Sequence, residues 1–228
     1  AARAPTIAHP RTMNATRWHA HVHRSPAEIS PWIDAVAAFR LRNFRPFPYL
    51  YVGDMAYEQH YLRGFAAAAG ALLVTVHAAG KPTAPDLPNA PAPADSPGSL
   101  IAVSAAMPLR ETQDELAQAI AAFEAEGIPA QSVYYYSETL VEPAWRGQGV
   151  GRAIYAAREA HARSLGFQRV AFCAVEREPD HPLQPPGYKG NESFWRQAGF
   201  TPHPRLSLSL SWPTLQPTGE VREQTHRL

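Results

Sequence analysis

The feature that most constrains the fold is the stretch at residues 133–176, which has the pattern strand, glycine-rich turn, amphipathic helix and second strand. Residues 133–141 are rich in β-branched and aromatic types, residues 149–165 carry apolar side chains at helical spacing, and residues 170–175 are apolar on both faces. A strand, a helix of about four turns and a doubly buried strand form a right-handed parallel crossover. We therefore expect both strands inside one sheet, with the glycine turn at its carboxyl edge, where ligands bind.

Other segments supply the rest of this sheet. The patterns predict strands at residues 17–23, 72–77, 100–107 and 206–212, and helices at residues 31–44, 55–69 and 111–126. The expected fold class is mixed α/β (α+β), a single domain with antiparallel N-terminal strands, a parallel pair and flanking helices. The last strand has one apolar face, which pairing into a homodimer could bury.

Length and composition favour one domain. A chain of 228 residues with 45% hydrophobic residues can bury a sizeable core. We place that domain at residues 17–212, with a disordered lead-in at 1–16 and a C-terminal tail at 213–228. Six prolines interrupt residues 78–99, which we expect to project as a long hairpin loop.

Charge and cysteine content limit the partners. The formal net charge is +1 and Lys and Arg form no run, so neither nucleic acid nor a membrane surface is an expected partner. No stretch is long and apolar enough to span a bilayer, and residues 1–12 lack the apolar core of a secretory signal. The single cysteine, Cys173, fits a reducing compartment. A cytoplasmic protein with a small partner is expected.

The glycine turn predicts an anion site. Gly147, Gly149 and Gly151 lack side chains, so the chain can approach a ligand while the N–H groups up to Arg152 point into one concavity at a helix start. Phosphate suits such a site. A turn with a purely structural purpose is the alternative, because alternating glycines alone are a weak motif.

Two blocks of sequence are similar to motifs of one enzyme family. Residues 141–151 read Val-Glu-Pro-Ala-Trp-Arg-Gly-Gln-Gly-Val-Gly, and residues 191–200 read Asn-Glu-Ser-Phe-Trp-Arg-Gln-Ala-Gly-Phe. The first resembles the acyl-CoA-binding motif of the GCN5-related N-acetyltransferase (GNAT) family, a strand, Val-x-Pro, Arg/Gln-x-x-Gly-x-Gly/Ala and a helix. The second resembles the later, Asn-led helix of that family that ends in Gly-Phe, and the blocks occur in the family's order.

The resemblance implies that acetyl-CoA (coenzyme A) is the cofactor. Its pyrophosphate would lie on the glycine turn, and its pantetheine arm would follow residues 138–141 in a gap where two parallel strands splay. The cofactor-binding residues implied are Leu140, Val141, Arg146, Gly147, Gln148, Gly149, Val150, Gly151, Arg152, Asn191 and Trp195. Helix N-capping would explain Asn191 equally well, and core packing would explain Trp195.

Other phosphate motifs fit less well. A Walker loop needs Lys-Ser/Thr after its last glycine, where this chain has Arg152 and Ala153. A dinucleotide-binding fingerprint needs a glycine at position 152, although Glu176 imitates its ribose-binding acid.

Acyl transfer requires a neutral amine and therefore a base. An ammonium group of pKa about 10.4 costs roughly 4–5 kcal/mol to deprotonate at pH 7. Glu138 is the candidate base, because it lies midway along the cofactor strand, where the family often has a bulge. A carboxylate that pairs with an Arg or faces solvent is the equal alternative, and Glu142 is expected to be a solvent-facing spacer. A backbone N–H near Leu140 or Val141 would polarise the carbonyl.

The chain departs from the family at one catalytic position. Where the family's helix commonly presents a tyrosine as general acid for the thiolate, this chain has Trp195. An indole is too weak an acid, but a thiol of pKa about 8.5 leaves as an anion for only about 2 kcal/mol at neutral pH. Tyr188 and Tyr136 are the candidate substitutes, with packing or binding as the alternative for each.

Remaining features are less informative. His19, His21 and His23 alternate along one strand, which indicates an exposed face more than a metal site, and Cys173 is expected to be an inert core thiol. The acceptor pocket is expected to use Phe47, Tyr49, Tyr51 and the 178–189 loop, whose prolines suggest a lid or a rigid wall.

The predicted function is N-acetyl transfer from acetyl-CoA to a primary amine in a ternary complex, with Glu138 and Tyr188 as catalytic candidates and a small-molecule or peptide acceptor. The alternative is a non-catalytic acyl-CoA-binding or interaction module on the same fold.

Overall fold

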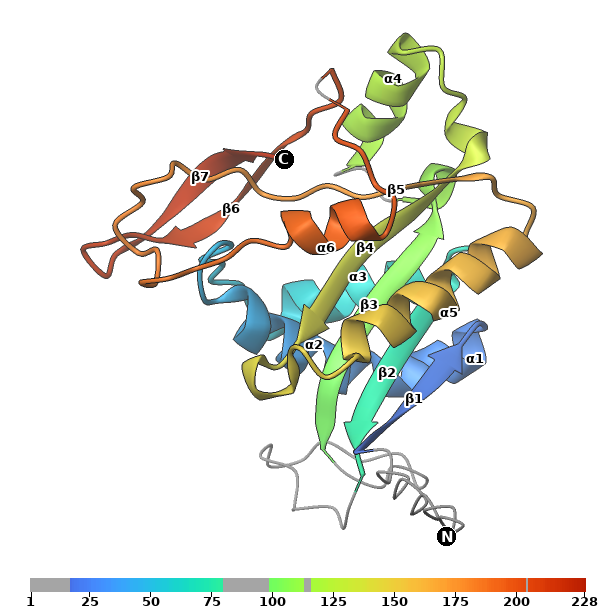
Figure 1. The fold of residues 1–228 in the computed structure, drawn as a ribbon, viewed down its shortest axis with the longest axis horizontal. Helices are drawn as coiled ribbons and strands as arrows, with labels where there is room; N and C mark the ends of the chain where they lie inside the picture. The colour runs from blue at the N-terminus through green and yellow to red at the C-terminus, as the bar shows by residue number, and fades with distance from the viewer. Residues whose placement is uncertain (1–16, 80–98, 113–115, 204) are drawn as a thin grey trace, which may run out of the picture.

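The computed structural model describes residues 17–79, 99–112, 116–203 and 205–228. The predicted lead-in at 1–16 and most of the proline-rich loop lie outside these residues. A five-stranded sheet forms the centre, and its strands follow one another in chain order (Figure 1). They are β1 (Trp18–His23), β2 (Leu72–Ala78), β3 (Leu100–Pro108), β4 (Val133–Val141) and β5 (Arg169–Ala171).

Pairing is antiparallel from β1 to β4 and parallel between β4 and β5. The parallel pairing joins residues 133–135 to residues 169–171 and then stops. Beyond Tyr135, the side of β4 that faced β5 has no strand partner among the described residues. The predicted fold class, a mixed sheet with antiparallel N-terminal strands and a splayed parallel pair, is confirmed.

A β-bulge lies in the middle of β4, where the splay begins. Ala105 pairs with Glu138 and Ala106 pairs with Tyr136, so Ser137 is the extra residue. An extra residue shifts the alternation of side chains by one position. Tyr136 therefore packs against α5 (Val150–Ser164), whereas Glu138, two residues later, points to the opposite face.

Helices cover both faces of the sheet. On one face lie α1 (Pro26–Ile29), the 3₁₀ turn η1 (Ser30–Trp32), α2 (Ile33–Phe44) and α3 (Met55–Ala67), and on the other lie α5 and α6 (Glu192–Gln197) (Figure 1). Asp54 starts α3 by accepting a hydrogen bond from the Tyr57 N–H at 2.9 Å. Within the described ranges, no helix has both the length and the apolar character to cross a membrane.

Besides β4, one helix and several 3₁₀ turns lie between β3 and α5 in the described part of the chain. The helix predicted over 111–126 is observed as α4 (Ala117–Ala125), with residues 113–115 outside the described part. The described residues of this region also include the 3₁₀ turns η2 (Leu109–Glu111), η4 (Ala130–Ser132) and η5 (Pro143–Trp145).

The C-terminal residues form a separate hairpin of β6 (Ser209–Leu215) and β7 (Val221–Arg227). The boundary that the sequence placed at residue 212 therefore falls inside β6. Leu208, just before β6, is 4% exposed and packs with Ala119 of α4 and Tyr135 of β4. At Leu208, the apolar face predicted for the strand at residues 206–212 is therefore buried against other residues of the same chain.

β5 differs from its sequence prediction in length and position. The apolar run at 170–175 predicted a strand inside the sheet, but β5 has three residues and forms the sheet edge. Phe172 packs instead on Trp195 and Phe200, with ring centroids 5.0 and 4.8 Å away. The Glu176 N–H donates to β7 at Arg227 O, 3.0 Å away. Residues 170–175 are apolar because α6 and the C-terminal hairpin pack over them, not because strands flank them on both sides.

Arg177 joins three segments near this hairpin. Its guanidinium donates to Pro48 O at 2.6 Å, to Tyr49 O at 2.8 Å and to His226 Nδ1 at 2.9 Å. Because arginine can only donate, Nδ1 of His226 must accept, and Nε2 carries the proton that bonds Thr214 Oγ1 at 2.7 Å. Burial, followed by the Arg177 charge, lowers the pKa of His226 to about 4. The start of the 177–188 loop is therefore a fixed wall.

We predict that this histidine makes stability depend on pH. The unfolded chain takes up the proton near the ordinary value of 6.5, above the folded pKa of about 4, so the free energy of unfolding falls as the pH drops between these values. Urea denaturation at several pH values measures this slope. His23, His161 and His181 also have lowered pKa values, so the informative quantity is the difference from His226→Gln. The variant should show a shallower slope, and equal slopes would contradict the assignment.

Candidate functional site

The glycine turn leads from the end of β4 into α5. After η5, Gly147 has φ of 73° and Gly149, the N-cap of α5, has φ of 86°. Both values lie in the left-handed region, where a side chain is disfavoured, so glycine is required at these two positions. Gly151 has ordinary helical backbone, and a Cβ there would lie 4.0 Å from Phe194 Cζ of α6. Gly151 therefore faces α6 without needing to be glycine for its backbone.

The turn presents a run of free amide groups. None of the six peptide N–H groups from Gly147 to Arg152 donates a hydrogen bond to any described residue, and the first amide bonded in α5 is that of Ala153, to Gly149 O at 3.1 Å. Gly147, Gly149 and Arg152 are exposed and Gln148 and Gly151 are partly exposed, whereas the Val150 side chain is buried. Six unpaired donors at the positive end of a helix have the geometry that favours an anion, so the predicted anion site is compatible with this turn.

Side chains of the motif hold the turn in shape. Arg146 Nε donates to Val141 O at 3.1 Å, and Gln148 Nε2 donates to Ala144 O at 2.7 Å. Trp18 Nε1 of β1 donates to Gln148 O at 3.3 Å. The predicted cofactor-binding residues Arg146 and Gln148 thus have internal bonds, whereas Arg152 is exposed and forms no ion pair with the described residues.

The edge of β4 beyond the splay carries further free groups. The Glu142 N–H donates to Ile101 O of β3, and amides along a strand alternate in direction. The Leu140 N–H therefore also points to β3, while those of Thr139 and Val141 point to the open edge. The sequence prediction named the Leu140 or the Val141 N–H as the group that polarises the carbonyl. The alternation favours Val141, and it adds the Thr139 N–H as a further candidate. Leu140 contributes a side chain that is 7% exposed and packs in the core with α2 and α3.

Glu138 belongs to a buried ion-pair cluster on the α2 face. Its Oε2 accepts a hydrogen bond from Arg40 Nη1, and Arg40 Nε donates to Glu58 Oε2. The side chains of Glu138 and Glu58 are 5% and 0% exposed. Oε1 of Glu138 has no hydrogen-bond partner within the described part of the chain. The carboxylate is thus paired with an arginine, one of the two interpretations of the sequence, and keeps one oxygen unengaged.

Glu142 is not the solvent-facing spacer that the sequence predicted. Its Oε1 accepts hydrogen bonds from Arg42 Nη2 at 2.7 Å and from Asn43 Nδ2 at 3.3 Å. The prediction was wrong because the bulge places Glu142 on the same face of the strand as Glu138, toward α2. Two ion pairs therefore fasten α2 to β4, one buried at Arg40 and one exposed at Arg42.

A cavity of about 850 Å³ opens beside the exposed pair. Three segments line it, namely α2 with the loop that follows it, the start of β3 and the end of β4 with η5. Tyr51 lies in its wall, and burial, then the nearby Glu58 carboxylate, raises the pKa of this tyrosine. Of the predicted acceptor-wall residues, Tyr51 alone lines this cavity, and Tyr51 also interacts with Glu58 of the Glu138 cluster.

Phe47 and the 177–188 loop contact each other. The rings of Tyr188 and His181 lie 4.8 and 5.5 Å from that of Phe47. Burial, then the Glu192 charge, raises the pKa of Tyr188. The phenol is therefore a weaker acid than an ordinary tyrosine and stays protonated at neutral pH.

The two α6 residues predicted to bind cofactor differ in their contacts. Trp195 packs on Phe172 at 5.0 Å, while Asn191 is exposed and its side chain makes no capping hydrogen bond to the helix. The N-capping alternative for Asn191 is therefore not observed. Phe194, 37% exposed beside Gly151, was not singled out from the sequence.

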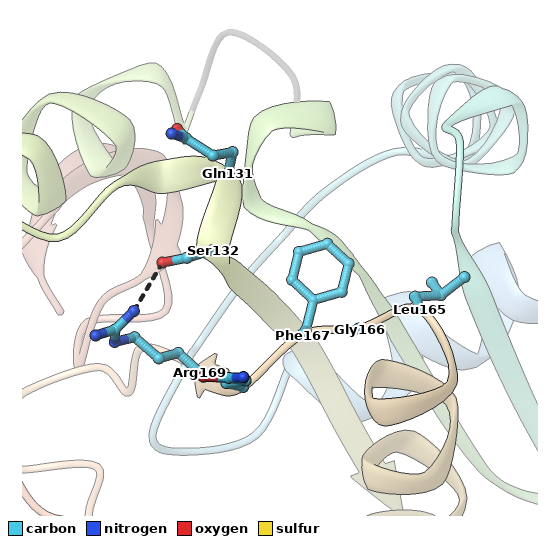
Figure 2. Close-up of a pocket in the computed structure, with 7 residues that line it drawn as sticks. Gln131, Ser132, Leu165, Gly166, Phe167 and Arg169 are labelled. Carbon is cyan, nitrogen blue, oxygen red and sulfur yellow. Dashed lines mark hydrogen bonds between the residues drawn. The ribbon is translucent and has the colours of Figure 1, made fainter.

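A second, smaller pocket lies at the other end of β4. About 180 Å³ in volume, it is lined by residues 131–132 and 165–169, where Arg169 donates to Ser132 at 3.2 Å (Figure 2). These residues precede β4 and follow α5, whereas the glycine turn follows β4 and precedes α5. The small pocket is therefore separate from the anion site.

Histidine and cysteine side chains do not add a second site. Within the described ranges, no three His, Cys, Asp or Glu side chains are grouped so that they could hold a metal ion. His19 and His21 are exposed on the edge strand β1, as a strand face in solvent would be. Burial raises the pKa of Cys173, which makes this thiol a poor nucleophile.

Comparison with known proteins agrees with this geometry. Residues 94–185, which include β4, the glycine turn and α5, match the sequence model of the acetyltransferase (GNAT) family. The match, which covers 92 of the 228 residues, confirms the resemblance of the first motif to this family. The second motif, at 191–200, lies beyond the matched residues. No curated protein matches the chain.

Several solved acetyltransferase structures are similar to this one. Aminoglycoside N-acetyltransferase AAC(6′)-Iy in complex with CoA has 13% sequence identity and a TM-score of 0.47, over 86% of this chain and 93% of that chain. AAC(6′)-Ih from Acinetobacter baumannii has 15% identity and a TM-score of 0.45, over 81% and 92%. Ribosomal-protein-alanine N-acetyltransferase from Brucella melitensis biovar Abortus 2308 has 10% identity and a TM-score of 0.40, over 81% and 93%.

Sequence reasoning missed three charged residues of this region. Arg40 and Glu58 flank Glu138, and Arg158 of α5 donates to Thr139 Oγ1 at 2.7 Å. All three are less than 9% exposed. Each lies in a helix whose apolar residues indicate core packing. The only sequence signal was a charged residue at a position that the helical period places on the buried side.

Proposed function

We propose that this protein is an N-acetyltransferase that moves the acetyl group of acetyl-CoA to a primary amine by direct attack in a ternary complex. One observation carries the proposal. Six unpaired amides at the start of α5 adjoin a strand edge left open by the splay, so free amides continue from the helix start along the strand edge. A pyrophosphate with an attached amide-containing arm has the chemistry to satisfy both.

The residues around the turn fit acetyl-CoA as the acyl donor. The amides from Gly147 to Arg152 would hold the pyrophosphate, and the Arg152 guanidinium would add a positive charge. The pantetheine arm would lie along the open edge of β4, with Asn191 and Trp195 of the α6 segment on its other side. Acetyl-CoA, when bound, supplies the acetyl group as a thioester.

Glu138 is the proposed base. Its pairing with Arg40 holds the carboxylate in one place, and Glu58 shares the same arginine, so the cluster keeps a formal excess of one negative charge. The unengaged Oε1 of Glu138 is then the atom that accepts the ammonium proton. The buried negative charge also favours an acceptor that arrives as a cation.

Backbone groups are proposed to polarise the reacting carbonyl. The N–H groups of Thr139 and Val141 point to the open edge one residue and three residues after Glu138, so no side chain is needed for this task. Tyr188 is proposed to contact the substrate with its protonated hydroxyl. The acceptor, a small molecule or a peptide, would enter through the cavity beside Tyr51.

A non-catalytic acyl-CoA-binding module is the second candidate, favoured by one observation. Trp195 stands where the family commonly has its acidic tyrosine, and it packs on Phe172. Turnover on amines distinguishes this candidate from the enzyme.

We predict that Gly151→Glu weakens CoA binding at least about tenfold, or about 1.4 kcal/mol. Gly151 has ordinary helical backbone and room for a side chain, so the variant adds a carboxylate to the anion site without backbone strain. Isothermal titration of CoA measures the effect. Gly151→Gln is the matched control, because it has the same size and no charge, and equal losses in both variants would contradict a phosphate at this turn.

We predict that Glu138→Gln lowers turnover at least about 100-fold without weakening CoA binding. The amide cannot accept a proton, and the CoA-binding groups are on other parts of the strand and turn. Acetyl-CoA consumption against a panel of amines measures the rate. Glu159→Gln serves as control, because Glu159 is a partly exposed carboxylate of α5 that pairs with Arg163. Unchanged turnover in Glu138→Gln would exclude it as base, and tight CoA binding with no turnover on any amine would favour the binding module.

A further inference from the structure

Arg158 is buried without an opposite charge. It lies on α5, is 7% exposed, and forms no ion pair with a carboxylate of the described residues. Its Nε has no hydrogen-bond partner there either. Arginine is seldom buried unless it is paired, because removing the charge from water costs several kcal/mol. An unpaired guanidinium in the domain interior therefore calls for a function.

The surroundings keep this guanidinium charged but uncompensated. Its Cζ lies 4.0 Å from the centroid of the Tyr136 ring, which offers a cation–π contact. The titratable groups around it are Tyr134, Tyr136 and Tyr155, and burial raises the pKa of all three, so they are neutral at pH 7. Burial lowers the pKa of Arg158 itself to about 10, which still leaves it cationic.

Thr139 connects Arg158 to the open edge of β4. Arg158 Nη1 donates to Thr139 Oγ1 at 2.7 Å. Ser104 Oγ donates its only hydrogen to Glu138 O at 2.6 Å, so in the 3.2 Å contact between the two hydroxyls Thr139 is the donor. Because this second bond is long, the Thr139 hydroxyl can turn its proton toward a ligand at small cost. Thr139 is exposed, unlike Arg158.

We infer that Arg158, acting through the hydroxyl of Thr139, stabilises the thiolate that leaves during acyl transfer, an inference that rests on the proposed function. A hydroxyl that accepts from a guanidinium is a stronger donor to an anion. This assignment supplies what Trp195 lacks, since a stabilised thiolate needs no general acid. Arg158 is a positioning residue in this scheme, and Thr139 is the group that contacts sulfur.

The step balances without a further reactant. The amine nitrogen bonds to the carbonyl carbon, the carbon–sulfur bond breaks, and its electron pair leaves on sulfur as the thiolate. An amine that arrives as an ammonium gives up two protons. Oε1 of Glu138 takes the first before the attack and releases it to solvent, and it takes the second from nitrogen as the amide forms. The Thr139 hydroxyl keeps its own proton and donates a hydrogen bond.

The test is the pKa of the thiol of CoA bound to the whole protein, followed by the ultraviolet absorbance of the thiolate as the pH is raised. The bound thiol should titrate at least about one unit below free CoA, the direction that a neighbouring cation produces. Arg158→Met should abolish this shift. Thr139→Val should also abolish it while leaving Arg158 in place, which keeps the test valid if the first variant folds poorly.

Matched variants separate the charge from general damage. Arg163→Met removes an exposed arginine of the same helix and should leave the shift unchanged. Arg158→Lys keeps the positive charge and should retain part of the shift. A bound thiol that titrates as free CoA, or a shift that survives Arg158→Met, would overturn the inference alone. Absence of CoA binding would overturn the proposed function and this inference with it.

Discussion

The end of the pairing between β4 and β5 is the constraint on which the site depends. Parallel hydrogen bonds join only the first three residues of β4 to β5, so the remainder of β4 has one edge without a strand partner among the described residues. That edge leads into the glycine turn, where left-handed glycines turn the chain and leave the first amides of α5 unpaired. A continuous line of free donors results, along a strand and then around a helix start. This backbone geometry fits the elongated ligand with an anionic end that we propose.

The bulge at Ser137 places groups of opposite charge on the two faces of β4. It directs Glu138 to the face of α2, where one guanidinium meets two carboxylates, and it directs Thr139 to the face of α5, where Arg158 meets none. The formal charge is thus negative on one face and positive on the other. Acyl transfer moves a proton from the amine and leaves negative charge on sulfur. The proposed base on one face and the Arg158 cation on the other would match these two needs without an acid on α6.

Local patterns predicted the parts of this site that are continuous in sequence. The strand, the two left-handed glycines and the start of α5 follow from residue types that admit few conformations, and the resemblance to the family implied acyl-CoA as the ligand. Arg40 and Arg158 were not predicted because their partners, Glu138 and Thr139, are 98 and 19 residues away in the sequence. Helical periodicity also predicts an apolar residue, not an arginine, at a buried position. The apolar run after β5 was misassigned to the sheet interior, since cover by α6 and a hairpin produces the same pattern as two flanking strands.

The most direct measurement is the change of backbone amide resonances on saturation with CoA, in a nitrogen-15 labelled sample. The amides from Gly147 to Arg152 should show the largest shifts, with those of Thr139 and Val141 next, because these are the donors left unpaired at the turn and the open edge. Leu140, whose amide points to β3, should shift less than its two neighbours. Largest shifts around Arg42 and Tyr51 in the α2 cavity, with the glycine turn unmoved, would contradict the assignment of the turn as the acyl-CoA site.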